Sequence, residues 1–214
     1  MPGWHPIGED IDFAKKTFEN YSKDVWGIKV TKEKKGLIAK EVTTPVSDKR
    51  GDLRAVFLAE GNEVRIGVAY KLGYDIVINS VDYPEGMVKM KEFMRGYQEY
   101  HFTEYYSELI EKDEKSQRAL QKELQKTERE ISNLRKQVNN NQSKITKAKS
   151  ESKKATLRTQ SADKRSRIEV LSASIPKLNE EISHLDTSIE NHQAMLDVFL
   201  VKLKDAVKAD QLLN

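Results

Sequence analysis

Nine basic side chains between positions 144 and 167 are the residues best suited to binding a ligand. They are Lys144, Lys147, Lys149, Lys153, Lys154, Arg158, Lys164, Arg165 and Arg167. Only two acidic residues, Glu151 and Asp163, lie in the same segment, so its net charge is +7 in a chain whose total is +3. Cationic groups at this density attract phosphate, anionic lipid or an acidic protein. The segment contains no aromatic residue for base stacking. A charged, solvated surface without a partner is the alternative interpretation.

Sequence motifs of the common enzyme classes are missing. There is no glycine-rich phosphate loop, no HExxH and no GxSxG. The chain has no cysteine, which excludes disulfides, thiolate metal ligands and cysteine nucleophiles. None of its four histidines has another histidine three or four positions away, so no helical metal pair exists. We therefore expect no catalytic residues, no cofactor, no metal and no enzymatic activity.

Two further groupings are better explained by structure than by chemistry. Asp10 and Asp12 form a possible carboxylate pair, but acidic residues at the start of a helix complement its dipole. Residues 94–108 are rich in aromatic side chains around His101, and at helical spacing such side chains usually form core. A ligand-binding surface on this helix is the alternative.

The second half of the chain carries two series of apolar residues in heptad spacing, which predicts a coiled coil. The first series comprises Leu120, Leu124, Thr127, Ile131, Leu134, Val138, Asn141, Ile145 and Ala148. The second comprises Ile168, Leu171, Ile175, Leu178, Ile182, Leu185, Ile189, His192, Leu196, Phe199, Leu203 and Ala206. Polar residues at such positions set the register of pairing, and we assign that role to Asn141 and His192. For His192 a pH-sensitive element is the alternative.

The phases of the two series differ by two residues, which a reversal of the chain explains better than a stutter in one helix. Opposed residues of the resulting hairpin would have numbers that add to 316, although heptad spacing allows this value to change in steps of seven. A sum of 316 places the turn near 156–160. No glycine or proline lies there, so a single long helix stays possible. The apolar residues 194–201 predict that the returning helix reaches the aromatic base of the outgoing one.

The first half has the pattern of an α+β domain. Apolar residues at helical spacing predict a helix over 9–25, for which Asp10 or Asp12 is the expected cap. Alternating residues separated by short turns then predict a five-strand antiparallel meander over 26–31, 37–39, 53–59, 64–70 and 74–78. We therefore divide the chain into a small α+β domain, 1–108, and a coiled-coil arm, 109–214.

Composition narrows the class of protein further. Charged residues make up 33% and mean hydropathy is −0.71. No apolar run has the length of a membrane helix, and the N-terminal residues do not resemble a signal peptide, so we expect a soluble protein of unassigned compartment.

These features predict a non-enzymatic interaction or scaffold protein whose arm engages a partner, most simply another protein. Nucleic acid or an anionic membrane surface at the basic segment is one alternative. The other is a ligand-binding or enzymatic sheet domain, with a pocket between the first helix and the meander, that uses the arm for assembly. Self-association is compatible with each of these.

Overall fold

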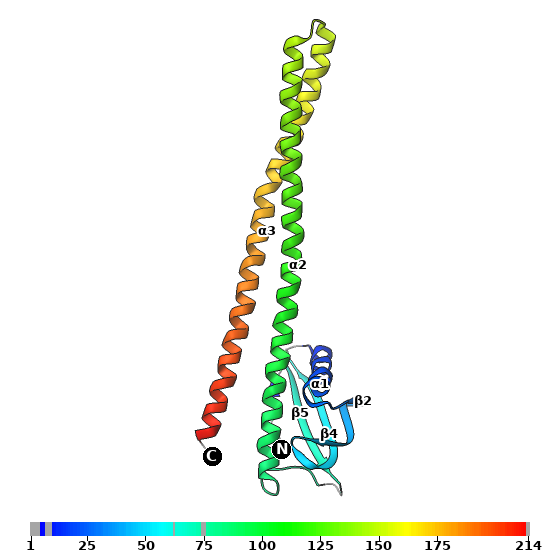
Figure 1. The fold of residues 1–214 in the computed structure, drawn as a ribbon, viewed down its shortest axis with the longest axis vertical. Coiled ribbons are helices and arrows are strands. Elements are labelled where there is room, and N and C mark those ends of the chain that lie inside the picture. Colours follow the sequence, from blue (N-terminus) through cyan, green and yellow to red (C-terminus); the bar gives the residue numbers. More distant parts are fainter. Residues whose placement is uncertain (1–4, 7–9, 62, 74–75, 213–214) are drawn as a thin grey trace. The chain divides into compact units, whose positions relative to one another are not determined.

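The computed structural model describes residues 5–6, 10–61, 63–73 and 76–212. The chain forms two compact units, 1–107 with 195–214 and 108–194, which we call unit 1 and unit 2 and describe separately. Figure 1 shows two long helices, α2 (Pro84–Lys147) and α3 (Glu151–Leu212). Each of them contributes residues to both units.

Unit 1 begins with helix α1 (Ile11–Trp26). The Asp10 side chain accepts hydrogen bonds from the backbone N–H groups of Asp12 and Phe13, which confirms Asp10 as the cap. The helix ends at Gly27, whose φ of +66° places it in the left-handed region that glycine adopts without strain. The possible carboxylate pair is therefore part of a helix start.

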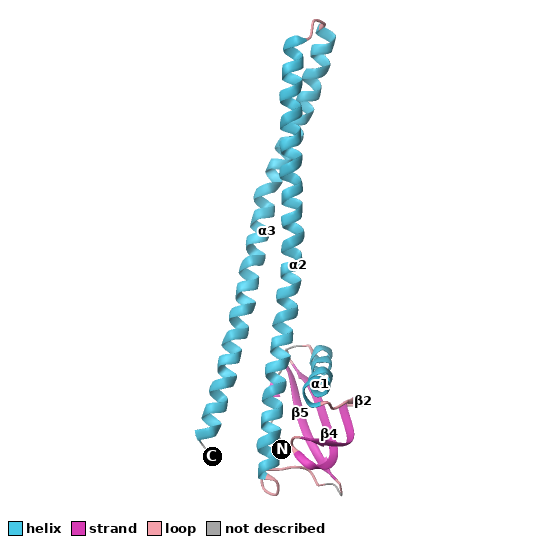
Figure 2. Ribbon diagram, viewed as in Figure 1, coloured by secondary structure: helices cyan, strands magenta, loops and turns pink. Residues whose placement is uncertain are grey.

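The sheet of unit 1 consists of four consecutive antiparallel strands and a short edge strand (Figure 2). The four are β2 (Thr31–Glu33), β3 (Gly36–Thr44), β4 (Ser47–Glu60) and β5 (Glu63–Leu72). The two-residue strand β1 (His5–Pro6) pairs with β5, giving the order β1-β5-β4-β3-β2. The predicted α+β class is confirmed.

The predicted five-strand meander is not confirmed, because both of its outer strands differ. Trp26 ends α1, and the first strand of the meander starts only at Thr31. Of the segment predicted as the last strand, residues 74–75 lie outside the described ranges, and Val77 forms an isolated bridge with Lys71 of β5. The bridge is flanked by two backbone hydrogen bonds, from Leu72 N–H to the Ile76 carbonyl at 2.7 Å and from Ile78 N–H to the Tyr70 carbonyl at 3.0 Å. Ile28 and Ile78 are nevertheless buried in the core. The alternating pattern therefore predicted burial correctly in both segments, although neither forms a strand of the predicted length.

Aromatic side chains of α1 and α2 form much of the core of unit 1. The ring of Phe18 meets those of Phe93 and Tyr97 edge-on, with centroid separations of 5.8 and 5.1 Å. The Tyr97 hydroxyl donates to the carbonyl of Ala14 at 2.8 Å. The Tyr97 side chain is fully buried, which confirms for this residue the prediction that the aromatic side chains of 94–108 form core.

Gly96 is needed where α2 passes close to α1. A Cβ at this position would lie 2.3 Å from the Tyr21 hydroxyl oxygen. That hydroxyl donates to the carbonyl of Phe93 at 3.2 Å. The last part of α3 also reaches the aromatic residues of unit 1, since the rings of Phe199 and Phe102 have centroids 3.8 Å apart, as predicted.

Unit 2 is an antiparallel pair of helices, which confirms the predicted reversal of the chain. Four pairs of side chains from α2 and α3 establish the pairing. Arg167 contacts Glu130 at 3.2 Å, Ser188 donates to Asp113 at 2.7 Å, His192 lies 3.6 Å from Asp113, and Gln117 donates to Asp186. The numbers of these pairs add to values between 297 and 305.

The turn lies at 148–150, so its predicted location at 156–160 is wrong. Residues 156–160 are within α3 instead. The observed sum centres near 302, which is two heptads below 316. A shift by whole heptads keeps the same apolar residues in the seam, so heptad spacing alone does not distinguish these registers. The backbone carbonyl of Ser150 accepts the first hydrogen bond of α3, from Lys154.

A basic surface on the helical hairpin

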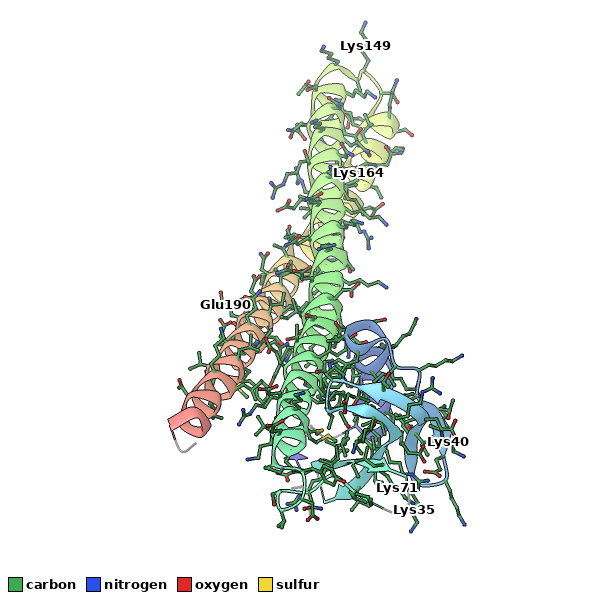
Figure 3. The ribbon with its side chains drawn as sticks, turned by 60° about the horizontal axis from the view of Figure 1, so that its bottom comes forward. Lys35, Lys40, Lys71, Lys149, Lys164 and Glu190 are labelled. Carbon is green, nitrogen blue, oxygen red and sulfur yellow. The ribbon has the colours of Figure 1, made fainter. Side chains whose placement is uncertain are left out.

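The nine predicted basic residues separate into two groups along the hairpin. Lys144 and Lys147 lie in the last turn of α2, Lys149 lies in the connecting turn, and Lys153, Lys154 and Arg158 lie in the first turns of α3. The other three, Lys164, Arg165 and Arg167, are centred about 15 Å farther along α3, at 1.5 Å per residue. Figure 3 shows Lys149 beside the turn and Lys164 farther along the hairpin.

The fold adds Arg135 and Lys136 of α2 to this surface, which sequence reasoning missed. The register places them at the level of Arg165 and Arg167 on α3. The distal hairpin, which we define as residues 131–168, therefore carries eleven basic and two acidic residues, a net charge of +9. The correct position of the turn is the signal that would have found both residues.

Most of these cations have no carboxylate partner. Lys154 pairs with Glu151 at 2.6 Å, and Arg167 pairs with Glu130 at 3.2 Å. The structure describes every residue of the distal hairpin, and within it the other nine basic residues form no salt bridge. An exposed salt bridge contributes only about 0–1 kcal/mol, so the net positive charge is the dominant property of this surface.

The register places like charges opposite each other on one side of the hairpin. The contact between Arg167 and Glu130 identifies the residues that flank the seam there. Two heptads nearer the turn, the same rule places Lys144 opposite Lys153. We call these two residues the lysine flank. A like-charged pair of this kind destabilises the helices by a few tenths of a kcal/mol.

On the other side of the seam the register places two arginines opposite each other. The register places Arg135 opposite Arg165 and Arg158 one heptad nearer the turn, opposite Gln142. We call Arg135, Arg158 and Arg165 the arginine flank. All three side chains are exposed. These charges therefore do not stabilise the hairpin, and an external anion would relieve their repulsion.

The exposed surface of the distal hairpin is polar throughout. Its exposed side chains other than the charged ones are Ser, Thr, Asn, Gln and Ala. An open groove of about 430 Å³ between the helices extends this surface, and Arg135 and Lys136 are among the residues that line it. Its lining residues are Glu128, Ile131, Ser132, Arg135, Lys136, Asn139, Ser172 and Ile175.

Asn141 and His192 both lie at the interface of the two helices, as their heptad positions predict. Asn141 is 8% exposed, and its Nδ2 has no hydrogen-bond partner. The register places it opposite buried Ser161, whose hydroxyl donates to the carbonyl of Leu157 at 2.8 Å. His192 is half-buried with Nδ1 3.6 Å from the Asp113 carboxylate. Their role in setting the register stays a prediction.

His101 belongs to the core of unit 1. It is 2% exposed, and its Nδ1 lies 2.7 Å from the hydroxyl oxygen of Thr17. The Thr17 hydroxyl also lies 3.0 Å from the carbonyl oxygen of Phe13. Phe13 contacts the imidazole edge-on at 5.3 Å. This arrangement holds the ring in place and leaves a substrate no access to it.

The space between α1 and the sheet is filled by side chains, with Ala14 and Phe18 completely buried. A small cleft of about 270 Å³ remains at the edge, between the start of α1 and the β2–β3 turn, where Lys15, Lys34 and Lys35 are mixed with Asp12 and Glu33. Among the described residues, no three His, Asp or Glu side chains are grouped closely enough to hold a metal ion.

Comparison of the chain with protein families, with curated proteins and with solved structures finds no match. No helix within the described ranges has an apolar stretch that would span a bilayer.

Proposed function

We propose that this chain is a non-enzymatic interaction protein that binds an anionic partner through the distal hairpin. The observation that carries the proposal is the set of nine basic side chains in this segment that form no salt bridge. Like charges oppose each other on both flanks, so binding an anion relieves a repulsion that folding leaves in place. A partner of opposite charge is also attracted at long range, which accelerates association.

Shortening the hairpin without changing its register tests this proposal. Deleting 131–144 together with 158–171 removes two heptads from each helix and keeps both the turn and the pairing of the seam. This deletion takes away seven of the eleven basic residues. Deleting 113–126 together with 176–189 shortens the hairpin equally, removes five basic and six acidic residues, and serves as the matched control.

Binding is measured with three polyanions: poly-L-glutamate, duplex DNA and vesicles that contain phosphatidylserine. We expect the full chain to bind at least one of them, the distal deletion to weaken that binding at least tenfold, and the control deletion to leave it unchanged. Circular dichroism is used to check that both variants are helical. The proposal is wrong if the full chain binds none of the three, or if the two deletions have the same effect.

A further inference from the structure

We infer that the anionic partner is a nucleic-acid duplex, held by its phosphate backbone on the arginine flank, Arg135, Arg158 and Arg165. This inference rests on the proposed function and assigns its ligand. It follows from what the distal hairpin exposes and from how the register arranges the three guanidinium groups.

The exposed residues of the distal hairpin disfavour a protein as the partner. Protein interfaces are centred on buried aromatic or large apolar side chains, which supply most of the binding energy. Between positions 131 and 168, no large apolar or aromatic side chain is exposed. Membrane-surface helices likewise insert apolar side chains such as Trp, Phe or Leu below the headgroups, and this surface offers none.

The same residues suit a phosphate backbone. More than half of the hydrogen bonds between proteins and DNA go to phosphate and sugar, from Arg and Lys and from Ser, Thr, Asn and Gln. These six residue types make up most of the exposed surface here. Single strands are bound by stacking their bases on aromatic rings, which this segment lacks, so a duplex is the better fit.

Arginine is the side chain most suited to this contact, because its planar guanidinium donates two parallel hydrogen bonds to one phosphate. Arg135 and Arg165 lie at one level of the hairpin, and Arg158 lies about 10 Å nearer the turn, one heptad along α3. Lys149 follows in the turn itself. A duplex carries about one charge per 1.7 Å of its axis, so each of these four cations has a phosphate within reach, whatever the base sequence of the duplex.

The inference predicts a measurable dependence on salt. Four cations that each neutralise one phosphate give a slope of about −3.6 in a plot of log K against log salt concentration. Replacing Arg135, Arg158 and Arg165 by Gln leaves Lys149 as the one remaining cation of the four and reduces the slope to about −0.9. If both proteins bind equally at 1 M salt, where the electrostatic contribution vanishes, this difference in slope lowers the affinity of the variant by about 500-fold at 0.1 M salt.

The experiment uses the full chain, a short DNA duplex of mixed sequence and fluorescence anisotropy. The matched control replaces the exposed residues Lys112, Lys115 and Lys122 by Gln, which changes the net charge equally but outside the distal hairpin. We expect the arginine variant to lose affinity and slope and the control to keep both. Arginine-to-lysine replacement at the three positions should retain most of the slope and part of the affinity.

Comparison with the other polyanions decides the ligand class. The inference is overturned if poly-L-glutamate or phosphatidylserine vesicles bind as tightly as the duplex at equal charge concentration, while the proposed function then stands. It is also overturned if the arginine variant and the lysine control bind the duplex equally. Failure to bind any polyanion contradicts the proposed function as well.

Discussion

The polar layer at Asn141 provides a sharp test of how this hairpin is held together. A buried amide donor without a partner lowers the free energy of unfolding by about 1–3 kcal/mol. Asn141→Leu removes the unpartnered Nδ2 and places apolar atoms beside the buried seam residues Val138 and Ile145. The larger side chain introduces some packing strain, which typically costs about 1 kcal/mol or more. We expect a net stabilisation of unit 2 by up to about 2 kcal/mol.

The same layer also bears on register. At the observed register Asn141 lies opposite polar Ser161, whereas a shift by one heptad would place it opposite apolar Ile168. Polar groups paired in one layer of a coiled coil disfavour such shifts. Asn141→Leu should therefore permit slippage. The chain has no cysteine, so a disulfide between Gln137→Cys and Gln160→Cys reports the register without interference.

The assay is thermal and urea unfolding followed by helical circular dichroism, together with the yield of that disulfide. Asn140→Leu is the matched control, because Asn140 is exposed on the same helix, and it should change stability by less than about 0.5 kcal/mol. A loss of stability in Asn141→Leu, or a gain no larger than that of the control, would refute the argument from the unpartnered donor. An unchanged disulfide yield would refute its role in register.

Three further changes test unit 1. Gly96→Ala places a Cβ 2.3 Å from the Tyr21 hydroxyl oxygen and should destabilise unit 1 by about 1–3 kcal/mol in urea unfolding, although alanine in place of glycine normally favours a helix. Burial raises the pKa of Tyr21 to about 12 and raises that of Tyr97 further, so the unfolded chain ionises first. The free energy of unfolding should therefore keep its full value below pH 10 and decrease from pH 10 to 12, which urea unfolding at a series of fixed pH values measures. Thr17→Val removes the hydroxyl beside Nδ1 of His101 and should cost about 1–3 kcal/mol in the same urea assay.

Each of these expectations has a control or a contradicting result. Gly73→Ala adds a Cβ into open space and should leave stability nearly unchanged, and equal effects of the two glycine substitutions would contradict the close-approach argument. Tyr21→Phe should flatten part of the alkaline decline, and an identical pH profile would mean that Tyr21 ionises normally. For Thr17→Val, unaltered stability would show that the contact with His101 contributes nothing.

Sequence alone predicted the elements whose signals are local. The helix start at Asp10 or Asp12, the alternation of β5 and the two heptad series depend on neighbours within a few residues, so they can be predicted along the chain. The reversal of direction followed from the mismatch between the two heptad phases. The basic character of the end of the hairpin was likewise visible, because charge composition does not depend on where the turn lies.

Tertiary structure decided the features that those local signals leave undetermined, namely the register of the hairpin and the ends of the strands. Heptads repeat every seven residues, so registers with sums of 316, 309 and 302 bury equivalent seams, and only the packed hairpin selects the turn at 148–150. That choice brings Arg135 beside Arg165 and forms the arginine flank. Apolar alternation likewise indicates burial but not where a strand begins or ends, since Ile28 and Ile78 are buried although both lie outside the strands of the sheet. Contacts between segments distant in sequence fix register and strand ends, and no local pattern contains them.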